Sequence, residues 1–348
     1  MIKLAIIGTG GMANDHAAKF QQIPECCIVA CSDIVPGRAC EFAAKYGISA
    51  AYENTLEMLQ NEEIDAVSVV TPDMYHVEPV MQALEMGKHV MCEKPLASNI
   101  DDAIKMSKLA DEKGVITAVN FSYRNSPATQ KAAELAASGA LGRIIHVEGS
   151  YLQQWLSSKC WGDWREAPAL LWRLSTKHGS AGVLGDIGVH LYDLVSFVVG
   201  DISEISCTLK TFDKGVDHIG EYDLDANDSM TAMVKFDNGA IGTMHSSRWA
   251  TGQPNTVALK VYGDKGALDL NLDRPEPDTL RVCIGENADK TVWESMPCPP
   301  VPNMYQRFIT AICESEQGQT SFKGGARVQS YLAASMESSC DVKPVAID

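Results

Sequence analysis

A glycine turn directly after the first apolar run constrains the fold of this chain more than any other feature. Residues 2–7 are typical of a buried strand, and Gly8-Thr9-Gly10-Gly11-Met12-Ala13 follows at once, before an amphipathic stretch that ends at Phe20. A G-x-G-x-x-A turn between a strand and a helix leaves backbone N–H groups at the helix N-terminus, where a pyrophosphate binds. The turn therefore predicts a dinucleotide-binding β-α-β unit.

An acidic residue in the right place supports that interpretation. Asp33 ends the next predicted strand, 20 residues after Ala13, and a carboxylate there accepts hydrogen bonds from both hydroxyls of a ribose. The competing interpretation is a tight turn with an unrelated aspartate. Asp33 favours NAD because it repels a ribose 2′-phosphate, but Arg38 lies five residues on and can accommodate that phosphate, so NADP stays open. The residues expected to contact the dinucleotide here are Gly8, Gly10, Gly11, Met12, Asp33 and Arg38.

The first part of the chain alternates strand and helix patterns. The predicted strands are 2–7, 28–31, 66–70, 89–92 and 116–120, and the predicted helices between them are 12–20, 36–46, 75–86 and 99–113. This rhythm is typical of a doubly wound parallel sheet with helices on both faces. We place a domain boundary near residue 122, giving a dinucleotide-binding domain over 1–122 and a second domain over 123–348.

The second part has a different pattern. After a proline-led helix over 127–138, most predicted elements are strands joined by short turns, at 144–153, 205–212, 230–236, 240–248, 257–261, 267–271 and 280–284. Such runs predict an open, largely antiparallel sheet. An apolar helix over 182–199 and a late helix over 305–314 complete the set. The fold class is thus α/β, with an α+β second domain.

Composition excludes several classes of function. The net charge of −16 and the lack of a Lys/Arg-rich run argue against nucleic acid or an anionic membrane as partner. The 11 cysteines are odd in number and include no C-x-x-C pair, so we expect no disulfide framework, no metal site and a reducing cytoplasm. No apolar run approaches the length of about 18 residues that a membrane span needs.

Two polar clusters follow later strands of the parallel sheet, at the strand ends where such sheets bind ligands. The first is Thr71-Pro72 with His76, and the second is Glu93-Lys94-Pro95. A lysine in that position can bind a substrate hydroxyl and stabilise negative charge that grows on its oxygen. Without the glycine turn, an ordinary surface lysine would be the favoured interpretation of Lys94.

The helix predicted over 182–199 carries the third cluster. Asp186 and His190 are four residues apart and would share one helical face, where the carboxylate can orient the imidazole as a general base. Gly185 and Gly188 weaken a helix, so we expect a reason for them, such as close approach of a flat nicotinamide ring. A core helix with a satisfied histidine is an equally good interpretation of this segment alone.

Together these motifs resemble the Gfo/Idh/MocA oxidoreductases, the family of glucose-fructose oxidoreductase and inositol dehydrogenase. The resemblance covers nearly the whole chain. It includes the motifs already described, Tyr123-Arg124 before the proline-led helix, Gly-Ala-Leu-Gly-Arg-Ile over 139–144, Trp172-Arg173 and Lys343-Pro344-Val345. One departure is Ser180-Ala181-Gly182, where many relatives have three glycines, and it puts transfer of a relative's substrate in doubt.

The resemblance implies a Rossmann first domain and a second domain whose open sheet often forms a homodimer or homotetramer interface. It implies that Lys94, Asp186 and His190 are catalytic, with His190 taking the hydroxyl proton, Asp186 orienting it and Lys94 binding the reacting oxygen. Either Lys94 or His190 can be the base. It further places at the cofactor Thr71, Pro72, His76, Glu93, Lys94 and Arg173.

Aromatic residues before the predicted catalytic helix suggest the kind of substrate. Trp155, Trp161, Trp164 and Trp172 fall in one short stretch, and indole rings stack on the C–H faces of sugars, although they can equally pack a domain core. The residues expected at the substrate are Lys94, Tyr123, Trp161, Trp172, Asp186 and His190.

These residues and the family resemblance together leave three functions open, the second and third of which are implied by the resemblance. The leading one is an NAD(P)-dependent oxidoreductase that moves a hydride between nicotinamide and a secondary alcohol carbon of a sugar, cyclitol or glycoside. The second is a closed redox cycle with tightly held NAD, which forms a keto-sugar or cleaves a glycoside. The third is a dinucleotide-binding regulator without turnover, and the presence of Lys94 counts against it.

Overall fold

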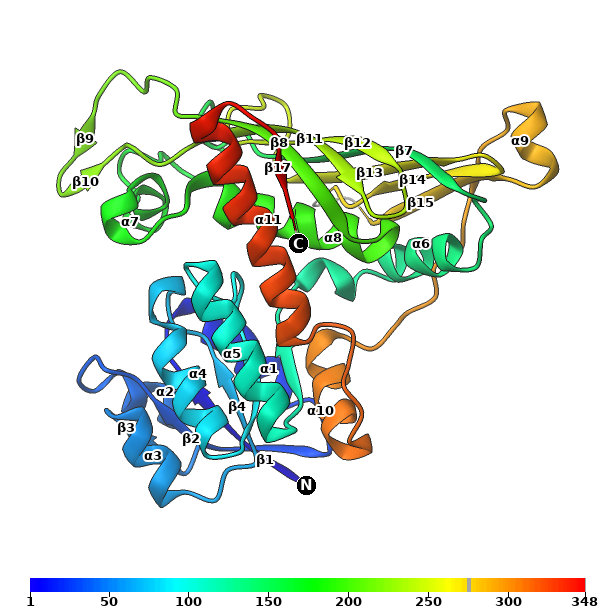
Figure 1. The fold of residues 1–348 in the computed structure, drawn as a ribbon. Helices are drawn as coiled ribbons and strands as arrows, with labels where there is room; N and C mark the ends of the chain where they lie inside the picture. Colours follow the sequence, from blue (N-terminus) through cyan, green and yellow to red (C-terminus); the bar gives the residue numbers. More distant parts are fainter. Residues whose placement is uncertain (274–276, 348) are drawn as a thin grey trace. The chain divides into compact units, whose positions relative to one another are not determined.

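The computed structural model describes residues 1–273 and 277–347 and divides the chain into two compact units (Figure 1). The first unit is Met1–Phe121 with Pro302–Gln329, and the second is Ser122–Val301 with Ser330–Asp348. The break at 121/122 lies one residue before the predicted boundary. The prediction that each domain is one continuous segment is wrong over 302–329. This segment returns to the first unit, where Tyr305 and Phe308 pack in the core.

The first sheet is parallel throughout. In the described part of the first unit, its six strands in order are β3 (Ala50–Tyr52), β2 (Cys26–Ser32), β1 (Ile2–Ile7), β4 (Ala66–Val69), β5 (His89–Cys92) and β6 (Thr117–Val119). Its helices are α1 (Gly11–Phe20), α2 (Arg38–Tyr46), α3 (Thr55–Asn61), α4 (Val77–Glu85), α5 (Ile100–Lys113) and α10 (Met304–Glu314). The prediction of a doubly wound Rossmann sheet is confirmed, and the short β3 and α3 were missed.

The order of the strands places the glycine turn at the point where the sheet reverses direction. From β1 the chain runs outward to β2 and β3, then returns to β4 on the other side of β1. Right-handed crossovers therefore put α1 and α2 on one face and α3, α4 and α5 on the other, and α10 packs on the face of α1. One core cluster joins Leu4 of β1, Phe20 of α1, Phe42 of α2 and Phe308 of α10. Ligands of such sheets bind at this reversal, beside the ends of β1 and β4.

The second sheet is mixed. Within the described part of the second unit its nine strands in order are β16 (Glu294–Ser295), β15 (Thr279–Ile284), β14 (Gly266–Asn271), β13 (Thr256–Gly263), β7 (Ile144–Leu152), β12 (Ile241–Ser247), β11 (Ser229–Phe236), β8 (Ile202–Lys210) and β17 (Val345–Ala346). Strands β7 and β12 pair in parallel and the remaining neighbours are antiparallel. The predicted open, largely antiparallel sheet is confirmed.

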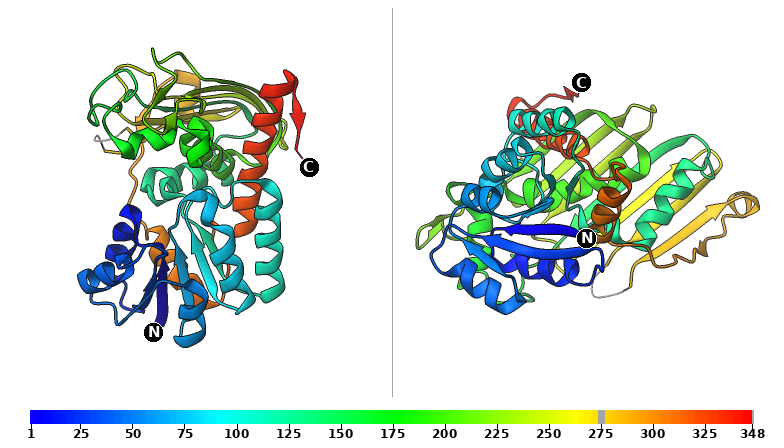
Figure 2. Two further views of the ribbon diagram at one scale, coloured as in Figure 1. Left: turned by 90° about the vertical axis from the view of Figure 1, so that its left-hand side faces the viewer. Right: turned by 90° about the horizontal axis from the view of Figure 1, so that it is seen from below.

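Helices α6 (Pro127–Ala137) and α8 (Val189–Val199) pack on one face of the second sheet (Figure 1). The opposite face carries no helix among the described residues (Figure 2). Burial alternates along β11 and β12 accordingly, with Ala232 and Met244 buried and Met233 and Ile241 exposed. A sheet with one covered face needs this period of two.

The tryptophan-rich stretch forms a small core of its own. Trp155 and Trp164 are buried there with Leu171, Leu174 and Leu224. The backbone around them contains α7 (Pro168–Leu171), two short 3₁₀ turns at Trp172–Leu174 and Thr176–His178, and the hairpin β9 (His218–Ile219) and β10 (Tyr222–Asp223). Of the two roles left open for these indoles, stacking on a sugar and packing a core, Trp155 and Trp164 take the second.

The remaining helices lie in the C-terminal part of the chain. The sequence patterns missed a 20-residue helix, α11 (Phe322–Asp341), whose first turns belong to the first unit and whose later turns belong to the second. Helix α9 (Glu286–Lys290) follows β15. No helix of the described residues is long and apolar enough to cross a bilayer.

Candidate cofactor and active site

The glycine turn is shaped to approach a pyrophosphate. Gly8 has a φ of +86°, and a Cβ on it would lie 2.9 Å from both the carbonyl carbon of Val70 and the nitrogen of Thr71, so only glycine fits there. A Cβ on Gly10 or Gly11 would meet no atom within 4 Å. No side chain caps the N-terminus of α1. Open space beside uncapped helix N–H groups suits a dinucleotide phosphate.

Asp33 is held where a carboxylate is expected to bind the adenosine ribose. Its Oδ2 accepts from the backbone N–H of Thr9 at 2.8 Å and from the Thr9 hydroxyl at 2.9 Å, and its Oδ1 accepts from the N–H of Val35 at 2.9 Å. Burial alone would raise the pKa of Asp33, but these hydrogen bonds and the charge of Arg38 hold it below its ordinary value. The carboxylate is thus ionised and oriented for two ribose hydroxyls.

Arg38 is turned toward Asp33. Its Nη1 lies 3.5 Å from both carboxylate oxygens, and its side chain is about half exposed. A guanidinium engaged with Asp33 is drawn away from the phosphate-binding role that NADP would require. The pair fits NAD.

The segment that follows β4 packs against this turn. Thr71 lies beside Gly8, as the space around Gly8 shows. His76 is completely buried, and its ring nitrogens lie 2.9 Å from the carbonyl oxygens of Thr71 and Pro95. The expectation that His76 hydrogen-bonds a cofactor does not fit this geometry, because both ring nitrogens are already used on main-chain oxygens.

Glu93 and Lys94 follow β5 and lie in a polar network. The Glu93 Oε1 is 2.9 Å from His16 Nε2 and 2.6 Å from Asn120 Nδ2, while Oε2 accepts from the N–H of Lys94 at 3.2 Å. Burial alone would raise the pKa of Glu93, but these bonds and the charges of His16 and Lys94 lower it to about 2. Glu93 is therefore an inward-facing support for Lys94 rather than a free surface acid.

In the second unit, Asp186 does not lie in a regular α-helix. Residues Leu184–Gly188 form a π-helical turn, η5, that leads into α8. The Asp186 Oδ2 accepts from Arg248 Nη2 at 2.9 Å and lies 3.4 Å from Arg173 Nε. π-Turns inside helices are frequent at functional sites because they turn a side chain out of the regular register.

One glycine of this turn, Gly185, has a packing reason, because a Cβ on it would collide with the Cβ of Ala181. A Cβ on Gly188 would make only an ordinary contact, 3.4 Å from Leu184 Cδ1. Close approach of a nicotinamide ring to this turn stays a prediction.

His190 lies among aromatic hydroxyls. Its ring centroid is 5.1 Å from that of Tyr123, edge to face, and 6.3 Å from that of Tyr151. The Tyr123 hydroxyl donates to the Tyr151 oxygen at 2.7 Å, and the Tyr151 hydroxyl donates to Asn255 Oδ1 at 3.1 Å. Burial, Tyr123 and the charge of Asp186 raise the pKa of Tyr151, which keeps its hydroxyl protonated.

The other predicted substrate and cofactor residues of the second unit are more exposed. Trp161 is 44% exposed. The guanidinium carbon of Arg173 lies 4.7 Å from the centre of the Trp172 ring, in cation–π range. Through Arg173, this pair is connected to Asp186.

Several residues of these sites were not predicted from the sequence. They are Thr9, His16, Asn120, Tyr151, Arg248 and Asn255. Two signals were available: Tyr151 stands at an inward position of a predicted strand, and Arg248 ends another. A cation at the end of a buried strand needs an anion, but the sequence does not tell which one.

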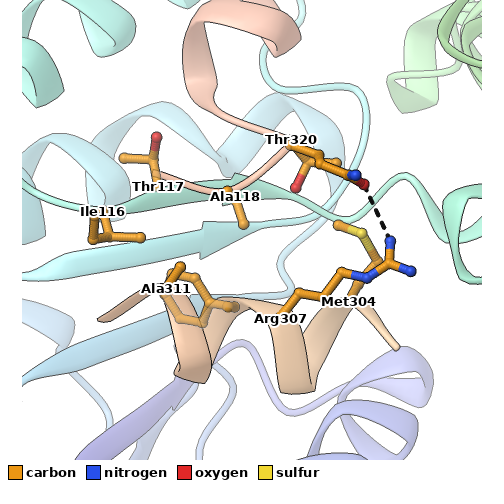
Figure 3. Close-up of a pocket in the computed structure, with 10 residues that line it drawn as sticks. Ile116, Thr117, Ala118, Met304, Arg307, Ala311 and Thr320 are labelled. Carbon is orange, nitrogen blue, oxygen red and sulfur yellow. Dashed lines mark hydrogen bonds between the residues drawn. The ribbon is translucent and has the colours of Figure 1, made fainter. Parts of the chain in front are cut away.

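A hollow elsewhere in the first unit has no predicted site residue in its wall (Figure 3). It lies between β6 and α10 and has a cavity volume of only about 10 Å³. Arg307 spans it and donates from Nη1 to Gln319 Oε1 at 3.3 Å. It is smaller than typical small-molecule sites. Among the described residues, no group of three or more His, Cys, Asp or Glu side chains is placed to hold a metal ion.

Comparison with known proteins agrees with this geometry. Residues 2–121 match the model of the oxidoreductase family with an NAD-binding Rossmann fold, and residues 129–269 match the GFO/IDH/MocA C-terminal domain. The chain belongs to the Gfo/Idh/MocA oxidoreductases. The predicted family and the predicted cofactor, NAD, are confirmed, and the chain is an oxidoreductase of CH–OH groups.

Three similar proteins are dehydrogenases of cyclic polyols by name. A levoglucosan dehydrogenase of Pseudarthrobacter phenanthrenivorans is 27% identical over 97% of this chain and 96% of its own length. A D-glucoside 3-dehydrogenase of Escherichia coli is 30% identical over 77% of each chain, and a scyllo-inositol 2-dehydrogenase of Bacillus subtilis is 27% identical over 90% of this chain and 83% of its own. A levoglucosan dehydrogenase structure with NADH and levoglucosan covers 99% of each chain, with a TM-score of 0.88 and 25% identity.

Proposed function

We propose that this family member is an NAD-dependent dehydrogenase that oxidises one secondary hydroxyl of a cyclic polyol, that is, a sugar, a cyclitol or a glycoside. The observation that carries the proposal is the match over 97% of the chain to a levoglucosan dehydrogenase. The glucoside and inositol dehydrogenases support the wider substrate class, because the substrates in their names are also rings with neighbouring secondary hydroxyls.

The cofactor would be held by residues of the first unit. The uncapped N-terminus of α1 beside Gly10 and Gly11 takes the pyrophosphate, and Asp33 takes the adenosine ribose. Thr71 lies against Gly8, and Pro72, the next residue, is proposed to contact the cofactor with it. When bound, NAD supplies the hydride acceptor for the alcohol carbon.

Lys94, Asp186 and His190 are the proposed catalytic residues. His190 accepts the hydroxyl proton as the C–H bond is broken, and the Lys94 ammonium stabilises the charge on the same oxygen. Asp186, ionised beside Arg248, accepts a hydrogen bond from a substrate hydroxyl or from the imidazole. The alcohol thus loses one hydride and one proton and becomes a ketone.

Substrate recognition involves the second unit. Tyr123, which contacts His190, and the exposed Trp161 are the proposed contacts, together with Trp172 beside Arg173. Indole and phenol rings supply flat apolar area for the C–H face of a sugar while hydroxyls and cations meet its oxygens.

The assembly and compartment belong to the same proposal. Met233 and Ile241 are more than half exposed on the uncovered face of the second sheet, which supports a homodimer or homotetramer formed through that face. The 11 cysteines of the sequence are all free thiols, which supports a reducing cytoplasm.

A panel assay tests the substrate class. The purified protein is incubated with NAD or NADP and about forty sugars, cyclitols and glycosides, and reduced nicotinamide is followed by absorbance. Reduction of NAD with one group of cyclic polyols is the expected result. Retained dinucleotide without reduction by any compound would instead indicate a closed redox cycle, and products would then be sought by mass.

Two alanine variants and their combination test the catalytic residues. Lys94→Ala and His190→Ala should each lower kcat at least about 100-fold while NAD affinity changes little. If both act on the same oxygen, the double variant should be far less impaired than the product of the single effects predicts. The variant that removes the titration of kcat between pH 5 and 8 identifies the base.

A further inference from the structure

The two residues that flank Lys94 are each held by a different buried histidine. His16, in α1, lies 2.9 Å from Glu93 Oε1 through its Nε2. His76 lies 2.9 Å from the carbonyl oxygen of Pro95 through its Nδ1. Both imidazoles are completely buried. Neither ring is open to solvent, so a role through Lys94 fits both better than direct contact with a substrate.

Each histidine also joins the Lys94 segment to a neighbouring strand end. The other nitrogen of His16 is 2.8 Å from the hydroxyl of Ser68, in β4. Because a carboxylate only accepts, His16 donates from Nε2 to Glu93. The ring therefore fixes the Glu93 carboxylate against the centre of the first sheet.

The second histidine connects Lys94 to the glycine turn. His76 Nε2 lies 2.9 Å from the carbonyl oxygen of Thr71, the residue whose nitrogen lies against Gly8. Both partners of His76 are carbonyl oxygens, one on each side of the ring. One ring thus ties the cofactor turn to the peptide that follows Lys94.

We propose that His16 and His76 are positioning residues for Lys94. His16 holds the preceding residue by its side chain, and His76 holds the following residue by its main chain, so the lysine stem starts from a fixed backbone. The proposal rests on the catalytic role proposed above for Lys94. A displacement of about 1 Å at a catalytic group can lower a rate about 100-fold.

Three substitutions of His16 separate positioning from packing. Gln can present an amide N–H near the place of Nε2 and keep the bond to Glu93, Asn reaches only the Ser68 side, and Leu removes both. We expect kcat to fall about 10-fold to 100-fold in His16→Leu and His16→Asn, and to recover most of that loss in His16→Gln. The Km for NAD should change little. Equal kcat in all three would overturn the role of His16.

His76→Leu and His76→Gln give the matching pair of variants at the second histidine. Gln can hold one of the two carbonyls and should lose less kcat than Leu. The assay uses the polyol oxidised fastest in the panel, and NADH binding and the melting temperature report folding. If the Leu variants fail to fold, the Asn and Gln variants of His16 carry the comparison.

A double-mutant cycle shows whether the histidines act through Lys94. In a Lys94→Ala background, His16→Leu and His76→Leu should lower kcat no further, because the group that they position is already gone. A further loss of the same size as in the wild-type background would show a structural role and overturn the proposal. If Lys94→Ala itself keeps full turnover, the proposed function fails instead, and the two failures are therefore distinguishable.

A second readout needs no substrate. The rate at which acetic anhydride labels Lys94, measured by peptide mass against the exposed Lys108 of α5, reports how tightly the Lys94 segment is held. Labelling of Lys94 relative to Lys108 should rise several-fold in His16→Leu and His76→Leu, but not in His16→Gln. An unchanged ratio in both Leu variants would overturn the proposal.

Discussion

Arg248 is completely buried, and its Nη2 donates to Asp186 Oδ2 at 2.9 Å. The Arg248 guanidinium also donates to the carbonyl oxygens of Arg173 and Gly182, and it lies 5.1 Å from the centre of the Trp155 ring. Burial lowers the pKa of Arg248 below its ordinary value, and the charge of Asp186 offsets only part of that shift. Asp186 therefore supports the fold of the second unit as well as the proposed chemistry.

Removing Asp186 should destabilise the protein. Asp186→Ala leaves the Arg248 charge buried without its hydrogen-bonded carboxylate, which typically costs about 3 kcal/mol or more. We expect a lower urea midpoint for Asp186→Ala, measured by tryptophan fluorescence. His190→Ala, which also removes a proposed catalytic group but strands no buried cation, is the matched control. Equal midpoints for the wild type and Asp186→Ala would show that Arg248 is compensated elsewhere.

Replacing Asp33 should change the cofactor preference. Asp33→Ser removes the ribose acceptor and releases Arg38 from its carboxylate partner. Loss of charge-assisted hydrogen bonds worth about 1.5–3 kcal/mol should weaken NAD binding about 10-fold to 100-fold, while NADP binding should improve. Titration of NADH and NADPH fluorescence measures both. Adding Arg38→Ala should abolish the gain for NADPH, and a gain that persists would mean that another cation binds the phosphate.

The loss of folding stability at acid pH should depend on Glu93. Its pKa of about 2 lies below the ordinary value of 4.5, so its contribution is complete above about pH 5 and is lost as the pH falls toward 2. A pKa difference of this size corresponds to at most about 3 kcal/mol. Glu93→Gln should be less stable at pH 7 and should show a flatter dependence of the urea midpoint on pH between 5 and 2. Glu112→Gln, at an exposed position of α5, should retain the wild-type slope.

The π-turn provides a packing test. Gly185→Ala should destabilise the protein by about 1–3 kcal/mol, because the new methyl group would overlap the Cβ of Ala181. Ala181→Gly removes the obstructing atom and should restore most of the loss in the double variant. Differential scanning calorimetry of the single and double variants measures this. No rescue would mean that the glycine is required for another reason, such as a bound ring.

Local patterns in the sequence determined most of the first unit. The glycine turn, Asp33 and the β-α rhythm are short-range features, and each reflects one strand or one helix meeting its neighbour. They predicted the parallel sheet, the dinucleotide site and the family. Helix α11 was missed because its apolar residues alternate with Gly324, Gly325 and serines, which weaken a helical pattern until tertiary packing supports it.

The tertiary structure decided what the charged and aromatic residues do. The sequence could place Asp186 four residues before His190, but only the fold brought Arg248, 62 residues away, to the carboxylate. It also made Trp155 and Trp164 core residues. It buried His76 between the carbonyl oxygens of Thr71 and Pro95, where both ring nitrogens are used on the main chain. The reason is physical: backbone geometry repeats over a few residues and can be read locally, whereas the partner of a buried charge or ring is chosen by contacts between segments far apart in the chain.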